Sequence, residues 1–367
     1  MTQSLPAQAP WSPSRKDVVI NAAAGVTLRA LPHIPDAVKR LMLGGRSITI
    51  DGNTLDTTLQ LMLTLQRPTG IDGLAAGDDV IGSRARLEIL AASFKQNIPV
   101  GKVTNLSIPG PAGPIPARHY SPKGDFAAPP PMLVFYHGGG QVIGSLNTHD
   151  DLCRKICREG AMHVLSVDYR LAPEHKAPAG ADDAFAAFLW ARDHAADLGA
   201  DTRRVAVGGD SAGGNLAALV AQRARTEAPG LPALQLLIYP VVNYRDDTRS
   251  QTLFAKGYFL TKHDLHWFRS KYLDGAELDA SDPRVSPLLA DDLTGLPPAL
   301  VVTGGFDPLR DEAQQYVDAM RAAGVAVDHR RFDSLVHGWA NFFPLGGGSA
   351  AATTEAISAL RAHLARA

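Results

Sequence analysis

The spacing of apolar and polar positions changes twice along the chain. From about residue 17 to 98 it predicts helices and loops, as in PDAVKRLMLGG and TLDTTLQLMLTLQ, where apolar residues recur at helical intervals. In the second stretch Leu61 and Leu65 fall outside the main apolar face, which predicts a helix buried on more than one side. Residues 1 to about 16, rich in Pro, Ser and Gln, predict a disordered terminus.

Beyond residue 98 the pattern becomes that of strands and helices in alternation. KVTNLSIPGPAGPIPARHYSPK predicts a β-hairpin around a Gly/Pro turn. Strand-like runs then follow in PMLVFY, AMHVLSVDY, RVAVGG, ALQLLIYP, PALVVTGG and AVDHRRFDSL, with helical segments between them and one at the carboxyl end. Such alternation predicts an α/β fold with a mostly parallel central sheet and helices on both of its faces.

The alternation is interrupted between residues 241 and 296, where aromatic residues are many and regular strands few. We interpret this stretch as an insertion over the carboxyl edge of the sheet, where α/β proteins place their ligand sites. The predicted organisation is therefore an N-terminal helical segment over 1–98, a core formed by 99–240 and 297–367, and the insertion at 241–296.

Composition and charge narrow the class of protein. The 367 residues are 45% hydrophobic and 20% charged, with a net charge of −1, so no broad field favours nucleic acid or an anionic membrane as partner. No apolar run approaches the roughly 20 residues of a membrane span, and the first residues lack a secretory profile, which predicts a cytoplasmic protein. Cys153 and Cys157 extend an apolar helical stripe and form a poor zinc site, so we expect reduced core thiols and no metal.

The stretch GGDSAGG, residues 208–214, raises three alternatives: a phosphate cradle, a nucleophile turn or a passive bend. A phosphate cradle is disfavoured, because the lysine of a P-loop is missing and Asp210 would place a negative charge in it. Gly209 to Gly213 instead match G-x-S-x-G between a strand and a helix, which presents Ser211 as a nucleophile. The five-residue pattern alone is a moderate signal, so the other parts of an acyl-transfer site must be found.

Such a site needs backbone donors for an oxyanion. The run HGGG follows a strand, and glycine lets backbone amides approach a substrate oxygen closely. We expect Gly139, Gly140 and Ala212 to donate their amides to the oxyanion. His137 has no partner at metal-ligand spacing, so we interpret it, with Gly138, as supporting this loop.

A serine nucleophile also needs a base and an orienting carboxylate. Among twelve histidines, His337 is favoured because it follows the last strand in SLVHGWANFF, whereas His363 lies on the terminal helix and His329 in a strand-like run. Asp307 directly follows a strand and precedes a proline, which keeps it on a loop at the sheet edge. The order Ser211, Asp307, His337 is that of an α/β-hydrolase.

The stretches HGGG, DYRLAPEH, GGDSAGGN, GFDPLRDE and VHGW, in this order over about residues 100 to 365, resemble the hormone-sensitive-lipase-like esterases, bacterial family IV. The first hundred residues are similar to the helical N-termini of mycobacterial esterases in that family. The resemblance implies an α/β-hydrolase core with a helical cap built from the N-terminal helices and the insertion. It also implies that Ser211, Asp307 and His337 form the triad, that Gly139, Gly140 and Ala212 form the oxyanion hole, and that DYRLAPEH performs no chemical step.

These features predict a serine carboxylesterase acting on small esters of short or medium acyl chain, without cofactor, as a monomer or dimer. The alternatives are a lipase or amidase using the same triad, or a non-catalytic ligand-binding member of the fold, which the intact context of His337 disfavours. Many family members carry an aromatic residue where this chain has Gln141, which leaves the polarity of the pocket open. We expect the pocket wall to draw on Gln141, Phe254, Tyr258 and Phe259, although packing within the cap explains each single aromatic residue better than contact with substrate.

Overall fold

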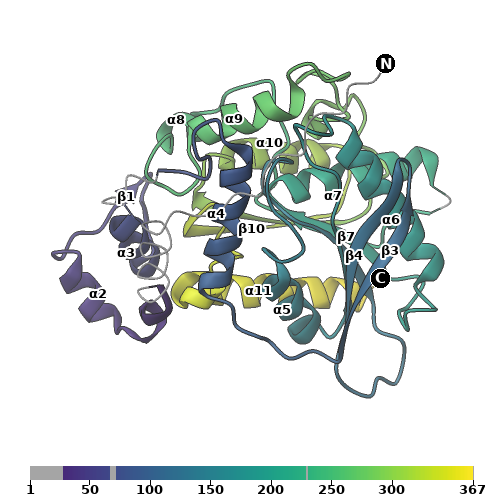
Figure 1. Ribbon diagram of the computed structural model, residues 1–367, viewed down its shortest axis with the longest axis horizontal. Helices are drawn as coiled ribbons and strands as arrows, with labels where there is room; N and C mark the ends of the chain where they lie inside the picture. Colours follow the sequence, from purple (N-terminus) through teal and green to yellow (C-terminus); the bar gives the residue numbers. More distant parts are fainter. Residues whose placement is uncertain (1–27, 67–71, 229, 367) are drawn as a thin grey trace.

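An eight-stranded sheet forms the centre of the computed structural model, which describes residues 28–66, 72–228 and 230–366 (Figure 1). The terminus predicted to be disordered, residues 1 to about 16, lies outside the described residues. The strand order is β10-β9-β8-β7-β5-β6-β4-β3. The strands are β3 (Lys102–Gly110), β4 (Gly113–Ser121), β5 (Met132–Tyr136), β6 (His163–Val167), β7 (Val205–Asp210), β8 (Gln235–Ile238), β9 (Ala299–Phe306) and β10 (Val327–Val336).

The neighbouring strands from β10 across to β6 pair in parallel, and only β6 with β4 and β4 with β3 pair antiparallel. This confirms the mostly parallel sheet and the β3–β4 hairpin that the sequence predicts. Every residue of β5, β6, β7 and β8 is buried, because helices cover both faces of these strands.

Two apolar cores lie on opposite faces of the sheet, and β5 shows how its strands supply both. Leu133 and Phe135 belong to one core, whereas Met132 and Val134 belong to the other, as the two-residue repeat of a strand requires. Helices α5 (Asp150–Gly160) and α11 (Gly347–Leu364) cover the first face, and α6 (Ala179–His194), α7 (Ala212–Glu227) and α10 (Arg310–Ala322) cover the second.

Apart from η4, which follows β10, the remaining helices come from the stretches before residue 98 and between residues 241 and 296, with α2 and α3 at one end of the molecule (Figure 1). Leu61 is buried whereas Leu65 is 39% exposed, so the expectation of burial on several sides of α3 is confirmed only for Leu61. No helix in the described ranges is long and apolar enough to cross a membrane. The N-terminal elements are η1 (Leu31–His33), α2 (Asp36–Met42), β1 (Thr49–Ile50), β2 (Asn53–Thr54), α3 (Thr57–Gln66) and α4 (Val80–Ser93), and the later ones are α8 (Arg249–Leu253), α9 (Lys262–Leu273), η3 (Pro287–Leu289) and η4 (Phe343–Leu345).

Helix α9 packs against α4 through a small apolar core, and hydrogen bonds to Asp264 tie it to the segment that precedes α4. Trp267 and Phe268 of α9 are buried in this core, and Leu87 of α4 packs against it. Asp264 closes a capping box at the start of α9 and also accepts hydrogen bonds from the amides of Leu74 and Ala75, at 3.0 and 2.8 Å. One carboxylate therefore links two segments that are about 190 residues apart in the sequence.

Candidate active site

The glycine-rich stretch forms a sharp turn from β7 into α7. Ser211 sits at its apex with φ 55° and ψ −117°, a strained conformation for a residue with a side chain. The chain turns so tightly that a Cβ atom at Gly213 would lie 1.8 Å from the carbonyl oxygen of Tyr136, and one at Gly209 would lie 2.3 Å from it. Both glycines are thus required by the close approach of β5.

Gly213→Ala is expected to lower the free energy of unfolding by about 3 kcal/mol, the upper end of the usual cost of overpacking, because the backbone of β5 must move to admit the methyl group. Urea unfolding monitored by circular dichroism measures the change. Gly230→Ala is the matched control, since a Cβ atom there would meet no atom within 4 Å. Equal stabilities of the two variants would contradict the steric argument.

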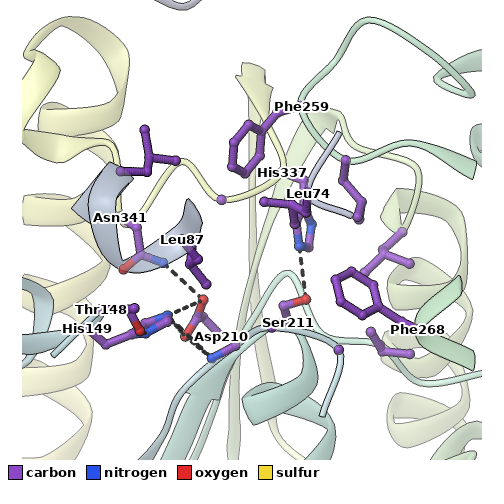
Figure 2. A pocket seen from close by; sticks show the side chains of 18 of the residues that line it. Leu74, Leu87, Thr148, His149, Asp210, Ser211, Phe259, Phe268, His337 and Asn341 are labelled. Carbon is purple, nitrogen blue, oxygen red and sulfur yellow. Dashed lines mark hydrogen bonds and ion pairs between the residues drawn. The ribbon is translucent and has the colours of Figure 1, made fainter. Parts of the chain in front are cut away.

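Ser211, His337 and Asp307 form a continuous hydrogen-bonded chain. The Ser211 Oγ atom lies 3.0 Å from His337 Nε2, and His337 Nδ1 lies 2.9 Å from Asp307 Oδ2 (Figure 2 shows the first of these contacts). Asp307 is fully buried and His337 is 3% exposed, whereas Ser211 retains 9% exposure toward a pocket. The structure therefore brings together the three residues that the sequence selected.

Strand register explains why Asp307 and His337 meet. In the parallel pair β9 and β10, Phe306 lies opposite Val336, so the next residue of each strand emerges at the same edge of the sheet. The amide of Leu309 donates to Asp307 Oδ1 at 2.8 Å, which orients the carboxylate and leaves Oδ2 for the histidine. Two residues 30 positions apart in the sequence are thereby placed within hydrogen-bonding distance.

The HGGG loop leaves β5 beside the nucleophile turn, because Tyr136 pairs with Gly209. Gly139 and Gly140 line the pocket with φ 120° and 61°, conformations that favour glycine, and a Cβ atom at Gly140 would lie 2.2 Å from the Phe268 ring. Ala212 is the first residue of α7, where amides lack partners inside the helix. These three amides lie in the two segments, the HGGG loop and the start of α7, from which an oxyanion hole was expected.

His137 is fully buried in the same loop. Its Nδ1 atom lies 2.8 Å from the Gly138 carbonyl oxygen, and its ring stacks on Tyr169 at 4.4 Å between centroids. Burial, and then the neighbouring His149, lower the pKa of His137 to about 4, so it is neutral at physiological pH. These contacts match the supporting role that the sequence suggested for His137 and Gly138.

A pocket of about 190 Å³ opens above Ser211. Figure 2 shows Phe259, Phe268, Leu74 and Leu87 around the serine and histidine, so residues before position 98 and residues between 241 and 296 both contribute to the pocket wall. Sequence patterns did not indicate Leu74 and Leu87 as wall residues, because an apolar side chain can face either a core or a cavity. The polar residues His149 and Asn341 belong to none of the motifs that point to this site.

The expected pocket wall is corrected at three of four positions, since Phe259 lines this pocket but Gln141, Phe254 and Tyr258 do not. The Gln141 side chain is buried, where it donates to Asn215 Oδ1 at 3.2 Å and accepts from the Tyr244 hydroxyl at 2.6 Å. The rings of Phe254 and Tyr258 pack against each other and against Phe306. The Gln141 side chain thus stabilises the HGGG loop on the side away from the pocket. The two aromatic residues pack against the end of β9.

Comparisons with known proteins agree with this geometry. A family model described as the alpha/beta hydrolase fold matches residues 133–341. The carboxylic ester hydrolase LipN of Mycobacterium tuberculosis is 53% identical over 381 aligned positions, with full coverage of both chains. This chain is an α/β-hydrolase. Its resemblance to the hormone-sensitive-lipase-like esterases is thereby confirmed.

Further relatives of this α/β-hydrolase are also esterases. The carboxylesterase NlhH of Mycobacterium tuberculosis is 42% identical and covers 64% of this chain and 74% of its own. An esterase structure from Pyrobaculum calidifontis superimposes with a TM-score of 0.76 at 38% identity, covering 84% of this chain and 98% of that one. An ester hydrolase from the metagenome of Lake Arreo has a TM-score of 0.79 at 40% identity, covering 85% and 99%.

The hydrolase also buries Glu312 in the wall of the pocket. Burial raises the pKa of this carboxyl to about 8, although the amides of Val242 and Asn243 and the side chain of Gln251 donate to it, and the charge of Asp307 adds to the rise. Because the folded state holds the proton more tightly than the unfolded state, the stability from Glu312 is present in acid and lost as pH rises through about 8.

Glu312→Gln is therefore expected to flatten the decline of melting temperature between pH 5 and pH 9, since glutamine keeps an acceptor oxygen but cannot ionise. Differential scanning calorimetry of both proteins across this range measures the effect. Glu355→Gln, at a carboxylate whose side chain is 54% exposed, controls for loss of a charge. Parallel curves for wild type and Glu312→Gln would count against the raised pKa.

Proposed function

We propose that this protein is a serine carboxylesterase that hydrolyses small esters of short or medium acyl chain through an acyl-enzyme intermediate. The observation that carries the proposal is the hydrogen-bonded chain from Ser211 through His337 to buried Asp307, which opens on a pocket. The named activity of the full-length relative LipN, a carboxylic ester hydrolase, supports the same reaction.

In the proposed mechanism, His337 Nε2 takes the hydroxyl proton as Ser211 Oγ attacks the ester carbonyl. Asp307 accepts a hydrogen bond from the Nδ1–H group of His337 and stabilises the imidazolium that forms. The carbonyl oxygen becomes an oxyanion that the amides of Gly139, Gly140 and Ala212 stabilise. His337 then protonates the departing alcohol, and a water activated by the same histidine releases the acid.

The proposal includes a helical cap over this site. We assign the cap to residues 1–98 and 241–296, and the catalytic core to 99–240 and 297–367. The pocket-lining positions of Leu74 and Leu87 from the first segment and Phe259 and Phe268 from the second support this division. Their apolar side chains favour an acyl chain or an alcohol group of modest size over a highly charged substrate.

Two experiments test the proposed function. An organophosphate is expected to label Ser211 alone with one equivalent, as read by peptide mass spectrometry. A p-nitrophenyl ester series is expected to give its highest kcat/KM at short or medium chains, above anilides and emulsified triglycerides. Labelling at another residue would contradict the proposed nucleophile, and faster hydrolysis of anilides or emulsions would favour an amidase or a lipase.

We also propose that the enzyme works in the cytoplasm as a monomer or dimer. In support, Cys153 and Cys157 are both buried free thiols, and burial raises the pKa of Cys157 to about 12, so it stays protonated and unreactive. Cell fractionation and analytical ultracentrifugation test these two points. Recovery in the membrane fraction, or a larger assembly, would contradict them.

A further inference from the structure

A second histidine–carboxylate pair lies beside the nucleophile and has no step in the proposed mechanism. His149 Nε2 lies 3.1 Å from Asp210 Oδ1 and 3.3 Å from Oδ2, and the two residues are only 4% and 3% exposed. Asp210 directly precedes Ser211, and Figure 2 shows its carboxylate between His149 and Asn341. The pair is therefore buried in the floor of the pocket rather than in the cap.

The Asp210 carboxylate accepts hydrogen bonds from three parts of the site. Its Oδ1 atom accepts the Gly138 amide at 2.9 Å, and its Oδ2 atom accepts the Asn341 side-chain amide at 3.0 Å and, at 3.4 Å, the Tyr239 hydroxyl. A carboxyl group that accepts several N–H and O–H donors is favoured in its ionised form. Burial opposes ionisation, but His149 and the Gly138 amide together keep the pKa of Asp210 below its usual value.

The hydrogen bonds around His149 place a proton on each of its ring nitrogens. The Thr148 hydroxyl carries a single hydrogen, which it donates to the Ser145 carbonyl at 2.9 Å, and it accepts the Ser145 amide at 2.9 Å. The contact of 2.8 Å between Thr148 Oγ1 and His149 Nδ1 then requires the proton on the ring nitrogen. His149 Nε2 lies 3.4 Å from the Gly138 amide, but that amide donates to Asp210 Oδ1 at the shorter distance of 2.9 Å. Since the ionised Asp210 can only accept, its contacts of 3.1 and 3.3 Å with Nε2 place a proton on that nitrogen as well.

We propose that His149 is a positioning residue whose imidazolium pairs with Asp210. This ion pair fixes two loops to the nucleophile turn: the HGGG loop and the loop after β10 that carries His337 and Asn341. The inference rests on the proposed function, because it concerns the same reaction. Gly138 donates from the first loop and Asn341 from the second, and both bonds end on the one carboxylate that His149 neutralises. A Cβ atom at Gly138 would lie 2.6 Å from Asp210 Oδ2, so this loop fits closely onto the pair.

The positive charge of His149 also offsets the negative charge of Asp210 during the reaction. A buried unpaired carboxylate next to Ser211 would oppose the negative charge that develops on the substrate oxygen, since charges interact strongly where water is excluded. His149 Nε2 lies within hydrogen-bonding distance of Asp210. Asp150, the next residue in the sequence, is paired with Arg118 and Arg154. The His137 ring lies 5.6 Å from the His149 ring, and Glu88 of α4, Lys95 and Asp151 of α5 line the same pocket.

Kinetics of His149→Gln, Asp210→Asn and the double variant test this role. Glutamine can donate to Asp210 but carries no charge, so we expect kcat to fall by about 10- to 100-fold, the range for losing an interaction with a charged group, while KM changes less than about threefold. Asparagine at 210 removes the unpaired charge, so the double variant is expected to recover at least part of that loss. A fall smaller than tenfold, or additive losses in the double variant, would overturn the inference.

Nitrogen-15 NMR of the wild-type protein labelled at histidine gives a readout that needs no variant activity. The signal of His149, identified by its absence from His149→Gln or His149→Asn, is expected to show protons on both ring nitrogens at pH 7. One unprotonated nitrogen on His149 would overturn the inference whatever the activity of the variants.

His363→Gln is the matched control, because His363 forms a pair with Asp328 at 3.0 Å away from the pocket, and wild-type kinetics are expected for it. Organophosphate titration of each variant separates the two proposals. If wild type hydrolyses esters with Ser211 labelled and His149→Gln keeps its kcat, only the role of His149 fails. If Ser211 is not labelled in wild type, the proposed function fails.

Discussion

Replacing Ser211 with alanine is expected to lower kcat for a p-nitrophenyl ester by a factor on the order of 10⁶ while the protein still folds. The hydroxyl oxygen is the only non-hydrogen atom removed, and the strained turn around it is held by backbone contacts that alanine can keep. The amide of Ser211 donates to the Ile238 carbonyl at 2.8 Å, and its carbonyl accepts the Asn215 amide at 3.0 Å. The loss therefore reports the nucleophile rather than the fold.

Steady-state hydrolysis and circular dichroism together measure this effect. Ser349→Ala is the matched control, because Ser349 is a buried serine of α11 outside the pocket, and it is expected to retain wild-type turnover. Residual activity of Ser211→Ala within a factor of 100 of wild type would show that another group attacks the ester.

Replacing Asp307 with asparagine is expected to lower kcat by about 10⁴. An asparagine amide facing His337 Nδ1 would donate a hydrogen bond, so the proton of the neutral imidazole would move to Nε2. That nitrogen lies 3.0 Å from Ser211 Oγ and could then no longer take the serine proton. The asparagine oxygen can still accept the Leu309 amide, which keeps the loop in place.

The pH dependence of kcat for Asp307→Asn separates this effect from unfolding, because hydroxide can replace the lost base and activity should rise with pH. Asp328→Asn is the matched control, since Asp328 also pairs with a histidine, His363, but lies away from the pocket. It is expected to leave kcat unchanged. Equal kcat for wild type and Asp307→Asn would exclude Asp307 as the orienting carboxylate.

Local sequence was sufficient to predict the residues of the hydrogen-bonded chain. The G-x-S-x-G pattern around Ser211 indicates a tight strand-to-helix turn. Asp307 and His337 each follow a strand. In a parallel sheet the carboxyl ends of neighbouring strands meet at one edge, so residues that follow strands gather there without any knowledge of distances. Their catalytic roles stay predictions until the experiments above are done.

The pocket wall was harder to predict. Gln141 follows the HGGG run and was expected to face substrate, yet its backbone has φ 57° and its amide side chain bonds Asn215 and Tyr244 behind the loop. Phe254 and Phe259 belong to the same aromatic-rich stretch, but only Phe259 reaches the pocket. Composition shows that a side chain is apolar, whereas its direction depends on packing between segments that are distant in the sequence.

The sequence by itself determined the alternation of strands and helices, the mostly parallel sheet and the positions of Ser211, Asp307 and His337 relative to strand ends, because each follows from short-range periodicity, turn chemistry and chain order. Only the tertiary structure decided which residues wall the pocket and that His149 meets Asp210, 61 positions away. Such contacts depend on how α4, α5 and α9 pack above and beside the sheet edge. Packing of this kind is set by the sum of many weak apolar contacts, which no single motif records.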